Sequence, residues 1–398
     1  MKAFPWPVGG RTKPRLYLWL WALALAGLIA VNLHLVDRTV AWASAPADFR
    51  LSLPAPSGPH KVGTAVLRLV QDDRPDPWRS GRPREILLQL WYPTAEAGAP
   101  AAYLGEAAAR HMAARYGFPP AALANLPTHA SLGAPVAAGR RPVLLFSPGD
   151  GGNRTDNTAL TQELASHGYV VVALDHPGDG LEVQRLDGSL IERSKPEPAD
   201  PDAAPHLSAG PQVAVRVADL RAVLDALARP DRFQGRVPAG LATALDLGRV
   251  GAFGHSLGGA TAAQAAAEDP RVDAAADLDG LVAGPVATKG LDKPFLILRS
   301  PWHTPERDPS WATFLPALRG WHRVISVTGA GHYAFADLGL WAARARLDLR
   351  MGRDTWATNF GDRPGPEATA VIRQALVGFF DSRLRGAPVP PILDREAI

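Results

Sequence analysis

A serine between two glycines carries the strongest chemical signal of the sequence. Gly254-His255-Ser256-Leu257-Gly258 follows the apolar stretch RVGAF and precedes the helix-forming stretch GGATAAQAAAE. In a nucleophile elbow the serine lies on a strained strand-to-helix turn, and only residues without bulk fit two positions before and after it. We therefore predict that Ser256 is a nucleophile and that Gly254 and Gly258 permit the turn. The alternative is a glycine-rich turn that exposes a serine without chemistry.

A serine hydroxyl attacks at neutral pH only when a base removes its proton, and histidine is the usual base. Of the 11 histidines, His332 alone follows the last expected strand, in VISVTGAGHYAFADL, where Gly329 and Gly331 allow the chain to turn. His322 precedes that strand and would lie at the opposite edge of the sheet. The ring of His255 would point away from the adjacent serine and pack near the site. We predict that His332 is the base.

Two backbone N–H groups must face the negative oxygen that forms when a serine attacks an ester. Leu257, the residue after the predicted nucleophile, supplies one. The loop SPGDGG, residues 147–152, follows an expected strand and is the natural second source, with Asp150 as the donor. This loop could instead cradle a phosphate, but the Gly-Lys-Ser/Thr of a nucleotide-binding loop is absent. The sequence therefore predicts an oxyanion hole formed by Leu257 and Asp150.

The elements that would position these groups alternate between short apolar stretches and helical segments, as in a buried parallel sheet with helices on both faces. The strands expected in that sheet are residues 143–146, 169–174, 250–253, 272–278, 295–298 and 324–327, and the helices are residues 160–167, 213–227, 258–267 and 369–382. Residues 62–70 and 85–92 alternate apolar and polar side chains and predict two antiparallel strands before it. The Pro-rich residues 193–211 are expected to form an irregular insertion.

The composition excludes several classes of protein. With 398 residues, 46% of them hydrophobic and 20% charged, the chain can bury a large core and lacks the composition of a disordered protein. Its 42 Lys and Arg nearly balance 39 Asp and Glu, and no basic stretch with interleaved aromatic residues occurs, so nucleic-acid binding is not expected. The absence of cysteine excludes disulfides and thiolate zinc sites, and no histidines show metal-ligand spacing. We expect neither a metal nor a cofactor.

The N-terminal region predicts a membrane segment. Residues 16–36 are almost uninterrupted apolar sequence, long enough to span a bilayer as a helix. More basic residues precede this segment than follow it closely, which predicts a cytoplasmic N-terminus and a folded domain outside the cytoplasm. The basic residues before it are Lys2, Arg11, Lys13 and Arg15. The alternative is a signal peptide cleaved near AWA, residues 41–43, after which the protein would be secreted.

These features divide the chain into five expected parts. They are a cytoplasmic tail (1–15), a membrane anchor or signal segment (16–36), a Pro/Ala-rich linker (37–60), the catalytic domain (61–388) and a C-terminal tail (389–398).

Several segments of the folded part share their motifs with one known family. They are PVLLFSPGDGGNRTDNTALTQELASHGYVVVALDH, GHSLGGATAAQA, AADLDG and GAGHYAFADL, together with GPHKVGTAVLRLV and ILLQLWYPT near the start. This pattern resembles the platelet-activating factor acetylhydrolase family, in its plasma and type II branch with bacterial relatives, over most of residues 59–382. The resemblance implies an α/β-hydrolase fold with a mostly parallel central sheet flanked by helices. It also implies a Ca²⁺-independent serine esterase that acts on short or oxidised acyl chains, including phospholipid sn-2 esters.

The acid that would orient the histidine has two candidate positions. In most α/β-hydrolases it follows the strand expected here at residues 295–298, but no carboxylate follows that strand until Glu306 and Asp308. The preceding strand ends in DLDG, and its Asp279 matches the acid of the acetylhydrolase motif. Asp277 lies on the same face of this strand as Asp279, but farther from the sheet edge where the loops converge. The resemblance therefore implies Asp279 as the acid of the triad, and a later carboxylate is the alternative.

Two residues depart from the family pattern. Pro148 stands where the animal enzymes have a histidine, and Asp150 replaces an apolar residue at the presumed oxyanion donor. Because a carboxylate that faced the oxyanion would oppose its charge, we expect the Asp150 side chain to turn outward. Cutinases, dienelactone hydrolases and polyester hydrolases share the elbow and are the alternative reading for the substrate, which we expect to be a small ester or a lipid. A non-catalytic binding module of the same fold is a second alternative, disfavoured because nucleophile, base and an acid candidate are all present.

Overall fold

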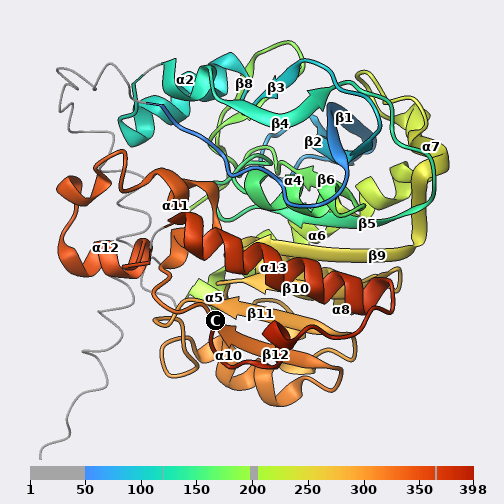
Figure 1. Cartoon of the computed structure of the whole chain (residues 1–398). Coiled ribbons are helices and arrows are strands. Elements are labelled where there is room, and N and C mark those ends of the chain that lie inside the picture. The colour runs from blue at the N-terminus through green and yellow to red at the C-terminus, as the bar shows by residue number, and fades with distance from the viewer. Residues whose placement is uncertain (1–49, 120, 198–204, 364) are drawn as a thin grey trace, which may run out of the picture.

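A ten-stranded sheet forms the centre of the protein, and helices pack on both of its faces (Figure 1). The computed structural model describes residues 50–119, 121–197, 205–363 and 365–398. The strands lie in the order β12-β11-β10-β9-β5-β6-β2-β1-β4-β3, and those from β12 to β6 run parallel to one another. The expected architecture, a mostly parallel sheet flanked by helices, is confirmed.

The strands of this sheet are β1 (Lys61–Pro75), β2 (Pro83–Thr94), β3 (Pro100–Ala102), β4 (Pro127–Leu132), β5 (Arg141–Ser147), β6 (Val170–Leu174), β9 (Leu245–His255), β10 (Val272–Leu278), β11 (Phe295–Arg299) and β12 (His322–Ser326). A separate hairpin pairs β7 (Val183–Gln184) with β8 (Leu190–Ile191). The helices are α2 (Glu106–Tyr116), α3 (Ala121–Ala124), α4 (Thr158–Ser166), α5 (Pro205–Ser208), α6 (Gly210–Leu227), α7 (Leu241–Ala244), α8 (Leu257–Glu268), α9 (Val286–Lys289), α10 (Pro309–Phe314), α11 (Asp337–Trp341), α12 (Arg353–Asn359) and α13 (Gly365–Leu384).

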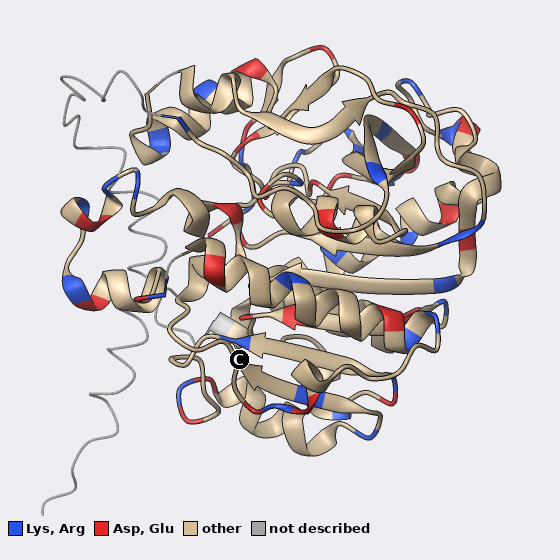
Figure 2. Ribbon diagram, in the orientation of Figure 1, with Lys and Arg blue, Asp and Glu red and all other residues tan. Residues whose placement is uncertain are grey.

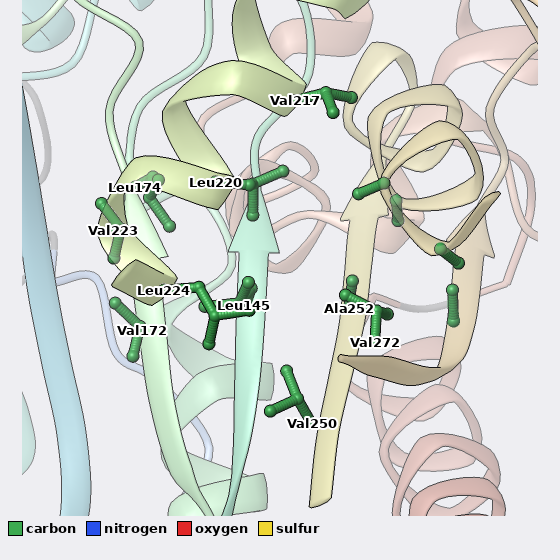
Figure 3. Close-up of a cluster of buried hydrophobic side chains, with 14 of the residues drawn as sticks. Leu145, Val172, Leu174, Val217, Leu220, Val223, Leu224, Val250, Ala252 and Val272 are labelled. Carbon is green, nitrogen blue, oxygen red and sulfur yellow. The ribbon is translucent and has the colours of Figure 1, made fainter. Parts of the chain in front are cut away.

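Strand β5 shows why the parallel half of the sheet reads as continuous apolar sequence. Val143 and Leu145 belong to the cluster that joins the sheet to α6 and α8, whereas Leu144 and Phe146 belong to the cluster on the opposite face, with α4 and α13. Both faces of the strand are therefore buried, and every position must be apolar. Figure 3 shows Leu145 among the side chains of α6 and the neighbouring strands.

The two strands expected before the parallel sheet form a long antiparallel pair. β1 and β2 are joined in register from Lys61 opposite Thr94 to Gln71 opposite Arg84, and β2 continues as the antiparallel neighbour of β6. The elements between β2 and β5 were not anticipated, because their short, Ala-rich segments carry no clear period. They bury a third apolar cluster together with α11.

The start of the folded body lies earlier than the expected boundary at residue 61. Leu51 and Leu53 are buried. The guanidinium of Arg373 on α13 donates hydrogen bonds to the carbonyl oxygens of Pro54 and Ala55. The last ten residues of the expected linker therefore pack on the domain instead of spacing it from a membrane, because their apolar side chains find a surface there.

The expected C-terminal tail, residues 389–398, is also part of the fold. Leu393 is fully buried in a short 3-10 helix (Pro391–Asp394). The N–H of Ile398 donates to the carbonyl oxygen of Ser326 at 2.9 Å, so the terminus pairs with the edge strand β12. This pairing satisfies backbone groups that an open sheet edge would leave exposed.

The predicted membrane segment, residues 16–36, lies outside the described residues. Within the ranges that the structure describes, no helix combines the length and the apolar character needed to cross a membrane.

Basic and acidic residues are interspersed along the chain (Figure 2). A few charged side chains are fully buried nevertheless, among them Arg84 with Asp219 and Arg216 with Asp179. Isolated buried charges are very costly, so these groups must be paired in order to lie there. The second pair borders the candidate site.

Replacing Leu145 by alanine should destabilise the domain by about 2–5 kcal/mol, because a side chain only 1% exposed leaves a cavity between β5 and α6. Urea unfolding followed by fluorescence measures this change. Leu132→Ala is the matched control, since Leu132 is 63% exposed and its truncation should cost less than about 0.5 kcal/mol. Equal costs at the two positions would contradict the core described above.

Candidate active site

The structure brings the three residues predicted as nucleophile, acid and base to one edge of the sheet. Ser256 directly follows β9, Asp279 directly follows β10, and His332 lies in the loop after β12. Because these strands run parallel in one sheet, their carboxyl ends meet at the same edge. Sites in open α/β sheets form at this edge.

Ser256 has the strained backbone of a nucleophile elbow, with φ 56° and ψ −123°. The two glycines beside it are required by close backbone contacts. A Cβ on Gly258 would lie 1.9 Å from the carbonyl oxygen of Ser147, and one on Gly254 would lie 2.2 Å from the backbone of Gly258. Such a strained conformation persists only when the surrounding packing imposes it. Helix α8 begins at Leu257 and thus starts directly behind the serine.

Asp279 and His332 are joined by a hydrogen bond. Nδ1 of His332 lies 2.8 Å from Oδ2 of Asp279. The other carboxylate oxygen of Asp279 accepts the N–H of Ser300 at 2.6 Å. Burial alone would raise the pKa of the Asp279 carboxyl, but hydrogen bonds with His303 and His332 hold it well below its ordinary value. The acid is therefore ionised, and Nε2 of His332 is left for the serine side of the site.

The contact between serine and histidine is not made in this structure. Among the described residues, Ser256 Oγ forms no hydrogen bond with His332. Contacts of this kind are often long in enzymes without substrate and tighten only when a substrate binds.

His255 packs against the base, as expected. Its Nε2 lies 3.0 Å from the carbonyl oxygen of His332, and the two rings have centroids 4.6 Å apart. Burial, together with the charge of His332, lowers the pKa of His255 to about 3. His255 is therefore neutral at ordinary pH, and its hydrogen bond fixes the backbone at His332, the candidate base.

The predicted oxyanion loop turns tightly beside the serine. The N–H of Gly152 donates to the carbonyl oxygen of Gly149 at 3.1 Å, and Gly151 has φ 68°, as a type II turn requires. A Cβ on Gly149 would lie 3.4 Å from Cβ of Ser256, so the loop and the elbow approach closely. The Asp150 side chain forms an ion pair with Lys195.

His303 is a member of the site that the sequence search missed. Its Nδ1 lies 3.4 Å from Asp279, its Nε2 lies 2.8 Å from Asp308, and its ring stacks on Trp311 with centroids 4.2 Å apart. Burial lowers the pKa of His303, but hydrogen bonds and charges of the two carboxylates outweigh it and raise the pKa to about 10. The signal that the sequence offers for His303 is its position in the loop after β11, at the sheet edge where the other site residues lie.

The alternative acids lie elsewhere. Asp308 caps helix α10 by accepting the N–H of Ser310 at 2.9 Å and the Ser310 hydroxyl at 2.6 Å, and its other carboxylate oxygen lies 2.8 Å from Nε2 of His303. Glu306 is exposed. Asp277 is buried against Gly280, whose N–H it accepts at 2.8 Å, and burial raises its pKa well above the ordinary value. None of the three shares a hydrogen bond with His332 among the described residues.

Within the described ranges, no cluster of three or more His, Asp or Glu side chains could hold a metal ion. The site contains a strained serine, a histidine oriented by an ionised acid and a loop of backbone N–H groups. These are the groups that acyl transfer requires.

Fold and site together define an α/β-hydrolase. The chain belongs to the family described as platelet-activating factor acetylhydrolase, isoform II, whose sequence model matches residues 48–180 and 238–349. A probable 1-alkyl-2-acetylglycerophosphocholine esterase of Arthroderma benhamiae is 26% identical in an alignment of 382 residues that covers 88% of this chain and 92% of that protein. The platelet-activating factor acetylhydrolase of Canis lupus familiaris is 28% identical in an alignment of 179 residues that covers 39% of this chain and 38% of the dog protein.

Among solved structures, a ferulic acid esterase from Streptomyces cinnamoneus superposes with a TM-score of 0.75 and 35% sequence identity. The similarity covers 87% of this chain and 96% of that protein. The protein is a carboxylic ester hydrolase, and the predicted family is confirmed.

Replacing His303 by asparagine should change how stability depends on pH. Because the pKa of His303 rises from 6.5 to about 10 on folding, its stabilising contribution is complete below pH 6.5 and disappears as the pH rises through about 10. The difference in unfolding free energy between wild type and His303→Asn should therefore shrink between these values. Urea unfolding at several pH values measures it, and a constant difference would mean that His303 is not a cation in the folded protein.

Proposed function

We propose that this protein hydrolyses esters through a Ser256–His332–Asp279 triad and an acyl-enzyme intermediate. The observation that carries the proposal is the 2.8 Å hydrogen bond between His332 Nδ1 and Asp279, formed at the sheet edge where the strained Ser256 lies. A binding module without catalysis would need neither the strain at Ser256 nor a buried ionised acid on this histidine.

The steps follow from the positions of these groups. Ser256 Oγ attacks the ester carbonyl carbon while Nε2 of His332 takes the hydroxyl proton. The resulting oxyanion accepts hydrogen bonds from the N–H groups of Leu257 and Asp150. The imidazolium, stabilised by Asp279, gives its proton to the departing alcohol oxygen. Water then attacks the acyl-enzyme with His332 again as base, which releases the acid and restores the serine.

The proposed substrates are esters of short or oxidised acyl chains, including phospholipid sn-2 esters. The names of the two similar proteins, an acetylglycerophosphocholine esterase and an acetylhydrolase, support this class. A second candidate class is aromatic acyl esters, because the structurally similar ferulic acid esterase shares 35% of its residues with this chain. Hydrolysis rates for p-nitrophenyl acetate, an sn-2 acetyl phospholipid and methyl ferulate separate the two classes.

Ser256→Ala and His332→Ala should each reduce kcat for p-nitrophenyl acetate by at least about 10³-fold, because nucleophile and base act as one unit. Asp279→Asn should keep the fold and lose most of kcat, because the amide favours the wrong tautomer of His332. The matched control is Asp308→Asn, which alters a carboxylate that hydrogen-bonds His303 and not the base. Asp308→Asn should be the milder of the two.

These kinetics are compared at equal folded fraction, measured by circular dichroism. Retained activity in Ser256→Ala would refute the nucleophile. A collapse of kcat in Asp308→Asn, with Asp279→Asn near wild type, would move the acid to the loop after β11.

We also propose that residues 16–36 anchor the enzyme in a membrane with the catalytic domain outside the cytoplasm, or that they are cleaved and the protein is secreted. The excess of basic residues before the segment supports the orientation. Protease added to intact spheroplasts should digest the catalytic domain of an anchored enzyme. Protection of that domain until lysis would contradict the proposed orientation, and a mature N-terminus near Ser44 would indicate cleavage.

A further inference from the structure

The oxyanion loop is supported by residues from a part of the chain that the family model does not match. Residues 181–237 lie between the two matched ranges. This intervening segment contains Arg216 on α6, and it also contains Arg193 and Lys195, all of which contact the loop or its partners. A role for these residues in catalysis rests on the proposed function, in which the Asp150 N–H faces the oxyanion.

Arg216 holds two consecutive carbonyl groups of the loop. Its side chain is 0% exposed. Nη1 donates to the carbonyl oxygen of Pro148, and Nη2 donates to the carbonyl oxygen of Gly149 at 2.9 Å. Nε donates to Asp179 at 2.8 Å, and Nη2 lies 2.6 Å from the same carboxylate. All three nitrogens of the guanidinium are therefore engaged.

This contact fixes the direction of the proposed oxyanion donor. The carbonyl of Gly149 and the N–H of Asp150 belong to one peptide unit. Because a trans peptide is planar, its C=O and N–H point in opposite directions. A guanidinium that anchors the Gly149 oxygen on one side thus aims the Asp150 N–H to the other side. The same loop lies close to Ser256, because a Cβ on Gly149 would be 3.4 Å from Cβ of Ser256.

Arginine suits this task better than lysine does. Two neighbouring carbonyls and a carboxylate need donors spread in one plane, which the guanidinium supplies and an ammonium does not. A buried cation also needs a counter-charge. Burial would raise the pKa of Asp179, but Arg216 and Lys195 hold it far below its ordinary value, so Asp179 is that counter-charge.

The side chain of Asp150 is held from the same network. Lys195, with only 2% of its side chain exposed, pairs with Asp150 and lies 3.3 Å from Asp179. Arg193 lies 3.3 Å from each of these carboxylates. The negative charge that distinguishes this loop from the family pattern is therefore offset by two cations.

We propose that Arg216, held by Asp179, is the positioning residue of the oxyanion hole, and that helix α6, which the family model does not match, thereby completes a catalytic feature whose other parts come from the family-matched chain. Arg216 acts through the Asp150 peptide and does not touch the substrate.

Arg216→Lys tests this role, because it keeps the charge and loses the planar set of donors. We expect kcat for p-nitrophenyl acetate to fall about 10- to 100-fold with KM changed less than about threefold, since the interaction matters only when the oxyanion forms. Affinity for a trifluoromethyl ketone, which forms a tetrahedral oxyanion adduct with the serine, should fall in parallel with kcat. Arg373→Lys is the matched control, because Arg373 is another buried arginine that donates to backbone carbonyls, at Ala159 and Pro54. It should keep kcat per folded molecule.

A double-mutant cycle with Asp150→Pro separates positioning from general loss of structure. Asp150 is the second residue of the Gly149–Gly152 turn, a position that suits proline in a type II turn, so this substitution removes the N–H and keeps the turn. Asp150→Pro should lower kcat about 10²- to 10³-fold. Arg216→Lys should then add less than about threefold, because the group it positions is gone. The control is Leu186→Pro, the second residue of the exposed Arg185–Gly188 turn, which should keep kcat.

The outcomes decide the proposal. Wild-type kcat in folded Arg216→Lys, or effects of Arg216→Lys and Asp150→Pro that multiply in the double variant, would overturn it. If Arg216→Lys does not fold, Asp179→Asn takes its place, with the same expected loss of kcat and the same lack of additivity. Activity retained in Ser256→Ala would refute the proposed function itself, whereas loss in Ser256→Ala with full activity in Arg216→Lys would refute only the role of Arg216.

Discussion

The close approach of helix α8 to the end of strand β5 is the constraint on which the site depends. The carbonyl oxygen of Ser147 leaves no room for a Cβ at Gly258, so the elbow and the oxyanion loop are in backbone contact. This contact holds Ser256 in a conformation that a free chain would avoid. It also places the candidate nucleophile Ser256 next to the glycine-rich loop. Preorganisation of this kind is what makes oxyanion stabilisation effective.

Charge pairing fixes the remaining groups around that contact. Asp279 is shared between His332 and His303, which keeps the carboxyl ionised although it is buried. At the glycine-rich loop, Asp179 is the counter-charge of the buried Arg216. Both arrangements place a charge where an apolar environment strengthens its effect, and both avoid an unpaired buried ion. The site is thus rigid for electrostatic as well as steric reasons.

Much of the fold could be predicted from the pattern of apolar residues. Strands buried on both faces, such as β5, need uninterrupted apolar sequence, and the glycines at 254 and 258 are demanded by local geometry. The short elements between β2 and β5 could not be predicted, because their stability comes from the third apolar cluster and not from a local period. For the same reason the sequence predicts a linker and a tail at the two terminal segments. Leu53 and Leu393 are buried only because distant elements cover them.

The sequence by itself determined the serine elbow, the strands that carry the candidate nucleophile, acid and base, and the family, because these depend on residues close together in the chain. The family resemblance already implied the pairing of Asp279 with His332, but only the tertiary structure shows that His303 contacts both Asp279 and Asp308. Asp279 and His332 are 53 positions apart and come together because β10 and β12 end at one edge of the sheet. The contacts of Arg216 with the loop could not be predicted from the sequence either, since its partners Pro148 and Gly149 precede it by 68 and 67 positions. Contacts between residues so far apart in the chain depend on how helices and strands pack, and their spacing in the sequence does not predict them.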